Sequence, residues 1–436
     1  MPPTSAHPAG AEAAPVPSNL APDTGMPLPR STMVRFGAGF LLISVLWAIG
    51  LSIIASVLLP QRLKDLGVAS PDALLGTINA ITAVVSLVSN LVFGNFSDRT
   101  RSRLGRRTPW VVCGGVLGGI TLFGVGVLTN TVLLTLDYCL CMVGLNMMLA
   151  PAIAVLSDRV PESIRGTMST FWGVGASMGY PLGAIIGARF IAGGTASVSG
   201  FVLGGVLMGV SGIVAVALWP RERSSADADV EAGSLVDLLQ SFIPPTRNAG
   251  DFYKAFVGRF TMLISYQMIN AYQLYIIQDY LHLSAEEVVT TVSVTNTIIL
   301  VTSLSGGFLG GPISDLLRRR KLPVVVSSLC FAAGVAMPWL IHSTMGMYLF
   351  AAIAGFGYAV YSSVDQALNV DVLPDPDKAG KDLGILNMST TLGQMCGPII
   401  TSFVVTRTGE YTLVFPISIA CAVLGCFSIL MIRKVR

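Results

Sequence analysis

Long apolar segments alternate with short polar connections along most of the chain. A helix needs roughly 20 apolar residues to cross the hydrocarbon core of a bilayer, and twelve segments reach about that length. Because a chain in lipid must satisfy its own backbone hydrogen bonds, such segments predict membrane-spanning α-helices. They lie at about residues 34–59, 73–95, 110–129, 131–156, 166–191, 200–219, 253–280, 288–310, 323–341, 345–370, 383–406 and 411–432. We therefore expect an all-α membrane protein with twelve transmembrane helices.

A long polar stretch at residues 220–252 separates the sixth segment from the seventh. As a cytoplasmic central loop, it divides the chain into two pseudo-symmetric six-helix halves, at residues 33–219 and 253–436. Residues 1–32 are a further region, and the first 29 of them hold eight prolines and no lysine or arginine. A secretory signal needs a basic start and an apolar core, so we expect a disordered cytoplasmic tail here.

The two halves repeat each other. The connection after the second segment reads Gly94-Asn-Phe-Ser-Asp-Arg-Thr-Arg-Ser-Arg-Leu-Gly-Arg-Arg-Thr-Pro-Trp110. A degenerate copy, Gly311-Pro-Ile-Ser-Asp315, begins 217 positions after Gly94 and is followed by four basic residues. Pro181 and Pro398 have the same separation. Duplication of this kind is typical of solute transporters, which hold their substrate near the membrane midplane between the repeats.

The distribution of basic residues predicts the orientation. Of the 436 residues, 53% are hydrophobic and only 12% are charged, with a net charge of +3. When both termini are placed in the cytoplasm, 23 of the 27 lysines and arginines fall on the inner side, as the positive-inside rule requires. We expect a multi-pass protein of the inner (plasma) membrane, surrounded by the lipid bilayer and without a nucleic-acid surface.

The twelve segments, the central loop and the Gly-x-x-x-Asp-Arg hairpin resemble the major facilitator superfamily over about residues 33–433. The hairpin motif has an extended form here, from Ser97 to Pro109. This extended sequence is similar to that of one branch, the glycoside–pentoside–hexuronide cation symporters and the sucrose–proton symporters. Asn146-Met-Met-Leu-Ala-Pro151, followed by Asp158, is similar to the fourth helix of the sucrose group. The resemblance implies a secondary transporter of a small-molecule substrate, working by alternating access as a monomer and without a cofactor.

At two places the chain differs from these symporters, and the differences limit which coupling ion and which substrate we expect. Ser86 and Asn90 stand where melibiose-type carriers have two aspartates in the second helix, so a sodium site built from carboxylates is not expected. Met142 and Ile153 stand where sucrose-type carriers have an aspartate and an arginine. We therefore expect coupling to protons rather than sodium, and uptake of a sugar, a glycoside or a similar polar solute other than sucrose.

The basic hairpin and its surroundings predict a gate. The carboxylate of Asp98 can cap a neighbouring helix N-terminus, and the arginines can bond acidic groups such as Asp158 on nearby inner loops. Such contacts would hold the inner side shut and break when the halves rock. The simpler interpretation is that the arginines only anchor the hairpin in the cytoplasm. The candidate gating residues are Gly94, Asp98, Arg99, Gly105, Arg106, Arg107, Asp158 and Asp315.

Charged residues inside spans are costly, so each is a functional hypothesis. Asp137 lies six residues into the fourth span, on the outer side, where it could carry the coupling proton or form a static pair with Arg189. Asp365 in the tenth span and Arg259 in the seventh lie at matching depths from the inner side. They could form a pair that breaks and reforms during transport, or a permanent brace. The candidate coupling residues are therefore Asp137, Asp365 and Arg259.

The seventh span is unusually polar and aromatic. Tyr266, Asn270 and Gln273 fall on one stripe, at spacings of four and three residues. Amides and phenols suit a neutral hydroxylated ligand, which they can stack against and hydrogen-bond. The alternative is that these side chains hold helices together. We take Tyr266, Asn270, Gln273 and, by the resemblance of the fourth span, Asn146 as candidate substrate-binding residues.

Other functions find little support. The chain has three histidines and seven cysteines without metal-ligand spacing, and it has no catalytic or phosphate-binding motif. We therefore expect neither an enzyme nor a metal site. The direction of transport is open, so a proton-driven exporter of a drug or secondary metabolite is the main alternative. A membrane receptor or scaffold that does not transport is the other.

Overall fold

The computed structural model describes residues 19–226, 245, 249–317, 319–374 and 379–433. Most of the predicted tail and central loop, and the side chain of Asp315, lie outside the described residues. Within them all regular secondary structure is helical, apart from an isolated β-bridge between Leu20 and Pro27.

The N-terminal half holds six long helical segments. The first runs over Arg30–Asp65 without a gap, and a π-helical stretch near its C-terminal end divides it into three parts. The elements are α1 (Arg30–Ser52), η1 (Ile53–Leu58), α2 (Leu59–Asp65), α3 (Pro71–Arg99), α4 (Thr108–Val127), α5 (Thr131–Arg159), α6 (Glu162–Arg189) and α7 (Val198–Leu218).

The C-terminal half holds six more. The seventh segment is also interrupted, since the α-helix stops at Asn270 and restarts three residues later. The elements are α9 (Gly250–Asn270), α10 (Gln273–Tyr275), η2 (Ile276–Tyr280), α11 (Ala285–Leu317), α12 (Lys321–Leu340), α13 (Thr344–Asp371), α14 (Ala379–Thr408) and α15 (Val414–Leu430). The described residues therefore confirm the all-α fold with twelve long helical segments in two halves.

Eight of the described helical segments are long and apolar enough to cross a membrane by composition alone. The others are α6, α9 with its continuation, α14 and the 17-residue α15. The first three carry many glycines or polar residues, which lower their hydropathy. Glycine lets helices approach closely in a membrane: a Cβ placed on Gly183 of α6 would lie 2.6 Å from the carbonyl oxygen of Ile49 on α1.

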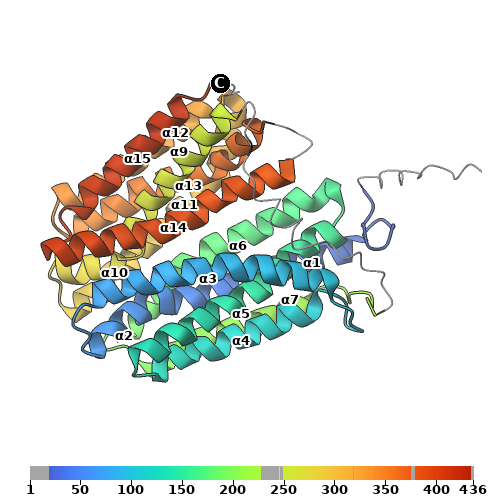
Figure 1. Ribbon diagram of the computed structural model, residues 1–436, viewed down its shortest axis with the longest axis horizontal. Helices are drawn as coiled ribbons and strands as arrows, with labels where there is room; N and C mark the ends of the chain where they lie inside the picture. Colours follow the sequence, from blue (N-terminus) through green and yellow to red (C-terminus); the bar gives the residue numbers. More distant parts are fainter. Residues whose placement is uncertain (1–18, 227–244, 246–248, 318, 375–378, 434–436) are drawn as a thin grey trace, which may run out of the picture.

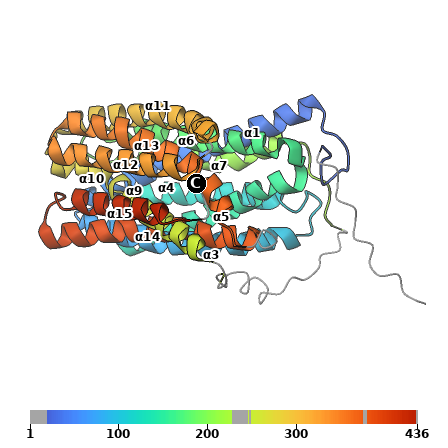
Figure 2. The same cartoon turned by 90° about the horizontal axis from the view of Figure 1, so that it is seen from above.

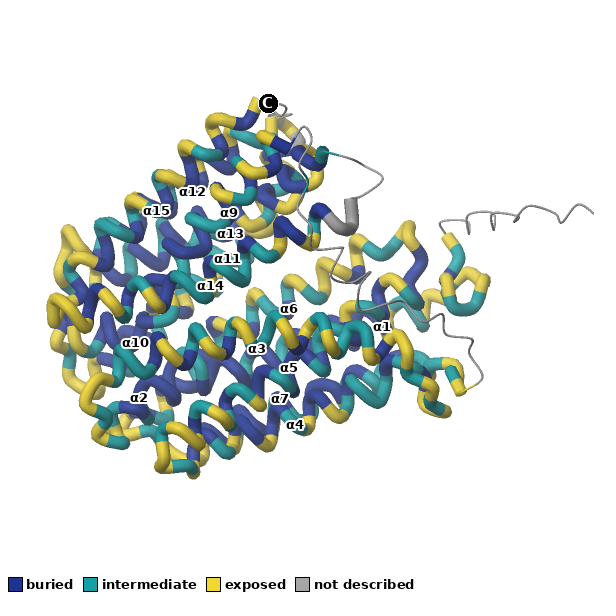
Figure 3. Tube along the Cα trace, viewed as in Figure 1, coloured by how far each residue is buried: buried dark blue, intermediate teal, exposed yellow. Residues whose placement is uncertain are grey.

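The two halves form two bundles that lean against each other (Figure 1; Figure 2). In the N-terminal bundle α1 packs on α6 and α7, and α4 packs on α5 and α7. In the C-terminal bundle α12 packs on α13 and α15, and α9 packs on α14 and α15. The bundles meet through α3 against α14 and α6 against α11. Buried positions run along the middle of each bundle, whereas exposed ones face outward (Figure 3).

We call the end of the molecule with Arg30, the basic hairpin and the C-terminus the inner end. The halves meet near α2 and α10, at the opposite, outer end, and diverge toward the inner end (Figure 1). The charge distribution predicts that the inner end faces the cytoplasm.

Residues 19–29 of the predicted tail lie against the N-terminal half. Ala21 is fully buried, and the carboxylate of Asp23 lies 3.3 Å from Nε of Arg159. Arg223 donates a hydrogen bond of 3.0 Å to the carbonyl oxygen of Asp23. The two arginines hold this segment against the inner end of the N-terminal half. The sequence pattern could not show this, because the contact joins positions far apart in the chain.

Candidate functional site

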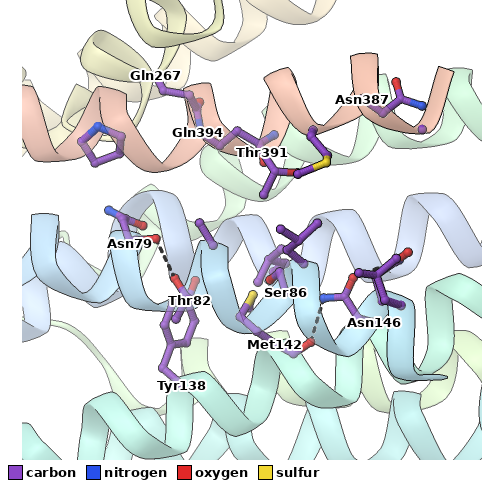
Figure 4. Close-up of a pocket in the computed structure, with 18 of the residues that line it drawn as sticks. Asn79, Thr82, Ser86, Tyr138, Met142, Asn146, Gln267, Asn387, Thr391 and Gln394 are labelled. Carbon is purple, nitrogen blue, oxygen red and sulfur yellow. Dashed lines mark hydrogen bonds between the residues drawn. The ribbon is translucent and has the colours of Figure 1, made fainter. Parts of the chain in front are cut away.

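A cavity of about 830 Å³ lies between the two halves. The N-terminal half lines it with α1, α3, α5 and α6, and the C-terminal half lines it with α9 and α14. Its lining runs along α3 from Asn79 to Leu91 and along α14 from Pro398 to Gly384, which is from the middle of the molecule toward its inner end. Figure 4 shows the labelled side chains of α3 and α14 across the cavity from each other.

The sequence of α3 explains why this helix can face both the cavity and lipid. Asn79, Thr82, Ser86 and Asn90 recur at spacings of three and four residues and line the cavity. Residues of the opposite face are large, apolar and exposed: Ile81, Val84, Val88 and Val92. Because 3.6 residues make one helical turn, the two sets form separate stripes on one helix.

The cavity wall is polar but uncharged. Among the described residues that line it, none is Asp, Glu, Lys, Arg or His. Its polar side chains are those of Asn79, Asn90, Asn146, Asn387, Gln267, Gln394, Thr82, Thr391, Ser86, Tyr138 and Tyr180. A carboxamide offers both donors and acceptors, and a hydroxyl does the same. This set suits a neutral solute that carries several hydroxyl groups.

The structure brings only one of the predicted substrate-binding residues to the cavity. Asn146 lines it, donating to the carbonyl oxygen of Met142 at 2.9 Å and accepting from Asn90 at 3.3 Å (Figure 4). Tyr266, Asn270 and Gln273 are not among the lining residues.

Each of those three lies elsewhere. The ring of Tyr266 stacks on Tyr358 with centroids 3.8 Å apart. Asn270 is exposed at the end of α9. Gln273 is buried and accepts a hydrogen bond of 3.4 Å from Asn296.

Sequence reasoning missed Gln267 and the polar stripe of α14, Asn387, Thr391 and Gln394, which line the opposite wall. The stripe has spacings of four and three residues, the same signal that indicated Tyr266, Asn270 and Gln273. In α14 the signal applies because the helix is continuous through all three positions.

The basic hairpin is held by contacts within the N-terminal half. Arg107 is nearly buried and pairs with Asp98, and its Nε lies 2.8 Å from Oδ2 of Asp158. Arg106 reaches the same Asp158 oxygen at 2.9 Å. Arg107 also donates to the hydroxyl of Ser97 at 2.5 Å. The predicted contact between the arginines and Asp158 is therefore present, while the gating role stays a prediction.

Glu222, which sequence reasoning did not single out, fixes the hairpin from the other side. Its carboxylate accepts hydrogen bonds from the backbone N–H groups of Arg106, Arg107 and Thr108, at 2.9 to 3.2 Å. These groups begin α4, so the carboxylate caps the positive end of that helix. Gly105 has φ +95°, and a Cβ there would lie 2.3 Å from the carboxylate carbon of Glu222. Only glycine fits this position without strain.

Two further hairpin residues have more open surroundings. A Cβ added to Gly94 would have no atom within 4 Å, so close packing does not require a glycine there in this conformation. The side chain of Arg99 is exposed.

Arg259 and Asp365 form a buried ion pair, with Nη1 3.3 Å from Oδ2. Arg259 also donates through Nε to the hydroxyl of Thr390 on α14, at 2.9 Å. Asn369 donates to Oδ2 of Asp365 at 2.9 Å. The contact expected from their matching depths is thus present, and it links α9, α13 and α14 just behind the cavity wall. Whether the pair breaks during transport stays a prediction.

Asp137 lies apart from the cavity. A Cβ placed on Gly124 would lie 2.4 Å from its Oδ2, so the carboxylate faces α4. That oxygen is buried and has no hydrogen-bond partner among the described residues. The described part of the chain shows no ion pair between Asp137 and Arg189.

Polar contacts join the halves at the outer end. Lys64 pairs with Asp279 at 2.6 Å, and Gln278 donates to Gln61 at 2.7 Å. Tyr275 donates to the carbonyl oxygen of Pro60 at 2.8 Å.

Two tyrosine hydroxyl groups of the C-terminal half donate hydrogen bonds to Asp72. Tyr272 donates to its carbonyl oxygen at 2.9 Å, and Tyr411 donates to its carboxylate. These contacts close the outer end, whereas the cavity extends toward the inner end.

Comparison with known proteins agrees with this architecture. The sequence description of the Major Facilitator Superfamily matches residues 39–252 and 255–436. The chain belongs to the major facilitator superfamily. No curated protein sequence matches it significantly.

Two solved structures of transporters share the superfamily fold with this chain. One is a bacterial homologue of the human lysosomal transporter Spinster, inward-facing and unoccupied. It is 13% identical, with 93% of this chain and 95% of that chain covered and a TM-score of 0.66. The other is a mutant of the nucleoside transporter NupG. It is 14% identical, with 92% and 100% covered and a TM-score of 0.71. At these identities the likeness shows the fold alone.

Proposed function

We propose that this superfamily member is a secondary active transporter that takes up a small neutral solute rich in hydroxyl groups, a sugar or glycoside, together with protons. The uncharged polar cavity between the halves carries the proposal. Sugars bind through many hydrogen bonds and carry no charge, which is the chemistry that carboxamides and hydroxyls serve. The resemblance of the hairpin to the sugar-cation symporter branch supports the same class.

Alternating access is supported by the unequal ends of the molecule. The outer contacts, including Lys64–Asp279 and Tyr411–Asp72, tie the halves together, while the cavity extends toward the inner end. For cargo to enter from outside, these contacts must break and the inner ends must come together. The hairpin fixed by Asp98, Arg107 and Asp158 lies at that inner end and is our candidate for the inner gate.

Coupling to protons requires an acid, and the cavity wall supplies none among its described residues. The two acids predicted from the sequence lie outside it. Asp365 is bonded to Arg259, which reaches the cavity-lining helix α14 through Thr390. Asp137 faces α4, which does not line the cavity. Asp365 is therefore the better placed of the two.

The neutral wall disfavours export of a cationic drug, since a buried cation needs a carboxylate partner. Purified protein should be melted in the presence of monosaccharides, disaccharides and lipophilic cations, because a ligand of the native state raises the melting temperature. We expect a sugar to raise it and the cations to leave it unchanged. The reverse result would favour the exporter, and no response to any solute would favour the receptor or scaffold.

Two variants in α9 test whether the sugar binds in the cavity. Gln267→Leu removes an amide from the cavity wall, and Asn270→Leu makes a similar change one turn away, at an exposed position that does not line the cavity. Loss of one hydrogen bond to a neutral partner reduces affinity by roughly two- to tenfold. We expect that reduction for Gln267→Leu and not for Asn270→Leu. Equal effects of the two variants would show that the cavity does not hold the sugar.

A further inference from the structure

The cavity is longer than a single sugar ring requires. On α3 its polar lining runs from Asn79 to Asn90, and these positions are 11 residues apart in the sequence, which is about 16 Å of helix. On α14 the polar lining runs from Asn387 to Gln394, which is about 10 Å of helix. Pockets that bury one drug-sized ligand measure roughly 300–1,000 Å³, and this cavity, at about 830 Å³, is near the upper end. A monosaccharide is much smaller than such a ligand.

The polar side chains of α3 follow one another about once per helical turn. They are Asn79, Thr82, Ser86 and Asn90, at spacings of three and four residues. Successive positions therefore lie about 5 Å apart along the helix. A pyranose unit of a linear saccharide has about this length, so each unit of such a chain would lie beside one polar side chain. The polar stripe of α14, described above, has the same spacing.

The two rows of polar side chains face each other across the cavity. Figure 4 shows Thr82 and Ser86 of α3 on one side and Gln394 and Thr391 of α14 on the other, in the same order along its length. Asn387 continues the row of α14 toward the inner end. We call the two rows together the polar track. A chain of sugars lying along it would meet hydrogen-bonding groups on both sides.

Much of the polar track is free to bond a ligand. The side chains of Asn79, Ser86, Thr391 and Gln394 make no hydrogen bond with another described residue. Asn90 at the inner end of the row donates instead to Asn146, as described above. The free amides and hydroxyls occur on both walls and can each donate and accept, so they can bond hydroxyl groups of more than one sugar unit.

An apolar row runs beside the polar row of α3. Ala83, Leu87 and Leu91 line the cavity at spacings of four residues. A pyranose ring has hydroxyl groups on its rim and C–H groups on its faces, so adjacent polar and apolar rows match both parts of a ring. The absence of charge from the described lining residues disfavours acidic and amino sugars, because a buried charge needs a partner.

We propose that the cargo is a linear neutral saccharide that binds lengthwise along the polar track, with room for about three units, since about 16 Å of helix spans three steps of about 5 Å. The inference rests on the proposed function and names the size class of its substrate. A monosaccharide occupies one part of the track and leaves the remaining amides without a ligand group.

A series of sugars of increasing length tests this. Calorimetric titration of the purified full-length protein would use linear mono- to tetrasaccharides of glucose, xylose, mannose and galactose. In the series that binds, affinity should rise roughly two- to tenfold with each unit up to the trisaccharide, because each unit adds at least one hydrogen bond to a neutral partner. It should then level off, since a fourth unit lies beyond the track. Affinity that stays constant or falls with length overturns the inference and leaves the proposed function standing. If none of these sugars binds, the proposed function is refuted, and the inference with it.

A variant at the inner end of the track gives a second test. Asn387 is exposed to the cavity, so Asn387→Leu removes an amide that only a longer chain reaches. It should lower the ratio of trisaccharide to monosaccharide affinity roughly two- to tenfold. Asn270→Leu, outside the cavity, should keep the wild-type ratio. Titration measures affinity separately from the fraction of folded protein, so partial unfolding does not imitate the effect. An unchanged ratio in Asn387→Leu would show that the inner part of the cavity is only an exit route, and lengthwise binding would be wrong.

Discussion

Gly76 on α3 lies where the two halves approach each other closely, near the outer end. A Cβ at this position would lie 2.5 Å from Cβ of Ser402 and 2.8 Å from the hydroxyl oxygen of Tyr272, both in the C-terminal half. Carbon atoms in contact are ordinarily about 3.5–4.0 Å apart. Gly76→Ala must therefore push the halves apart at the outer end, and it should favour the conformation in which that end is open.

The size of the effect follows from the overlap. Forcing one extra methyl group into a packed interface costs about 1–3 kcal/mol. The strain acts only on the conformation with the outer end closed, because separation of α3 from α14 relieves it. A difference of that size shifts a two-state equilibrium by roughly 5- to 150-fold.

Alkylation from outside measures this shift. In a variant whose seven native cysteines are replaced, a single cysteine at Asn79 lies on the cavity wall, inside the closed outer contacts. A membrane-impermeant maleimide added outside should react with it faster in Gly76→Ala, by about the same 5- to 150-fold. The control is Gly307→Ala on α11, where a new Cβ meets no atom within 4 Å. Equal rates in Gly76→Ala and the control would refute the reasoning.

Three further predictions concern charged residues. Asp98→Asn should cut transport while membrane insertion stays normal, because the arginines that set the topology are unchanged; wild-type transport rates would remove Asp98 from the gate. Arg259→Ala or Asp365→Ala alone should destabilise the protein by about 3–5 kcal/mol, since each leaves a buried charge unpaired. The double variant should recover most of the loss in thermal melting, and a double variant no better than the worse single would argue against the pair. Asp137→Asn should keep proton-driven accumulation, because its carboxylate faces α4 and not the cavity; lost accumulation with intact exchange would make Asp137 the proton carrier instead.

The fold could be predicted from the sequence because lipid imposes a simple constraint. Each span must be apolar and about 20 residues long, and the position of arginine and lysine shows which ends lie together. Even so, the helices extend beyond the apolar runs, as α3 does from Pro71 to Arg99. Polar residues beyond the hydrocarbon core can continue a helix in water, and hydropathy does not detect them.

The candidate site was harder to predict, because the seventh helical segment is interrupted. Tyr266, Asn270 and Gln273 form a stripe only if the seventh span is one regular helix. The α-helix stops at Asn270, before Gln273 begins α10, so Gln273 leaves the stripe. Tyr266 stays on α9, but its ring stacks on Tyr358 of α13 and does not line the cavity. Gln267, the neighbour of Tyr266, points to the cavity instead. By contrast, the contact between Arg259 and Asp365 could be predicted, because two opposite charges at one depth of a membrane have few other partners.

The hydrogen bond between Gln61 and Gln278 joins residues that are 217 positions apart, the same distance that separates the two copies of the hairpin. The two glutamines therefore occupy equivalent places in the two halves, and they touch where the pseudo-twofold axis passes between the bundles. On such an axis a side chain faces its own counterpart, so only a self-complementary group is stable there. A carboxamide is self-complementary, since it donates and accepts at once, whereas a charged residue would meet its own sign. Lys64 and Asp279 can attract each other because they lie off this axis: their own counterparts are Leu281 and Arg62. If the two halves arose from a pair of identical chains, the glutamine contact could have joined that pair before the halves diverged, while the ion pair required each half to change separately.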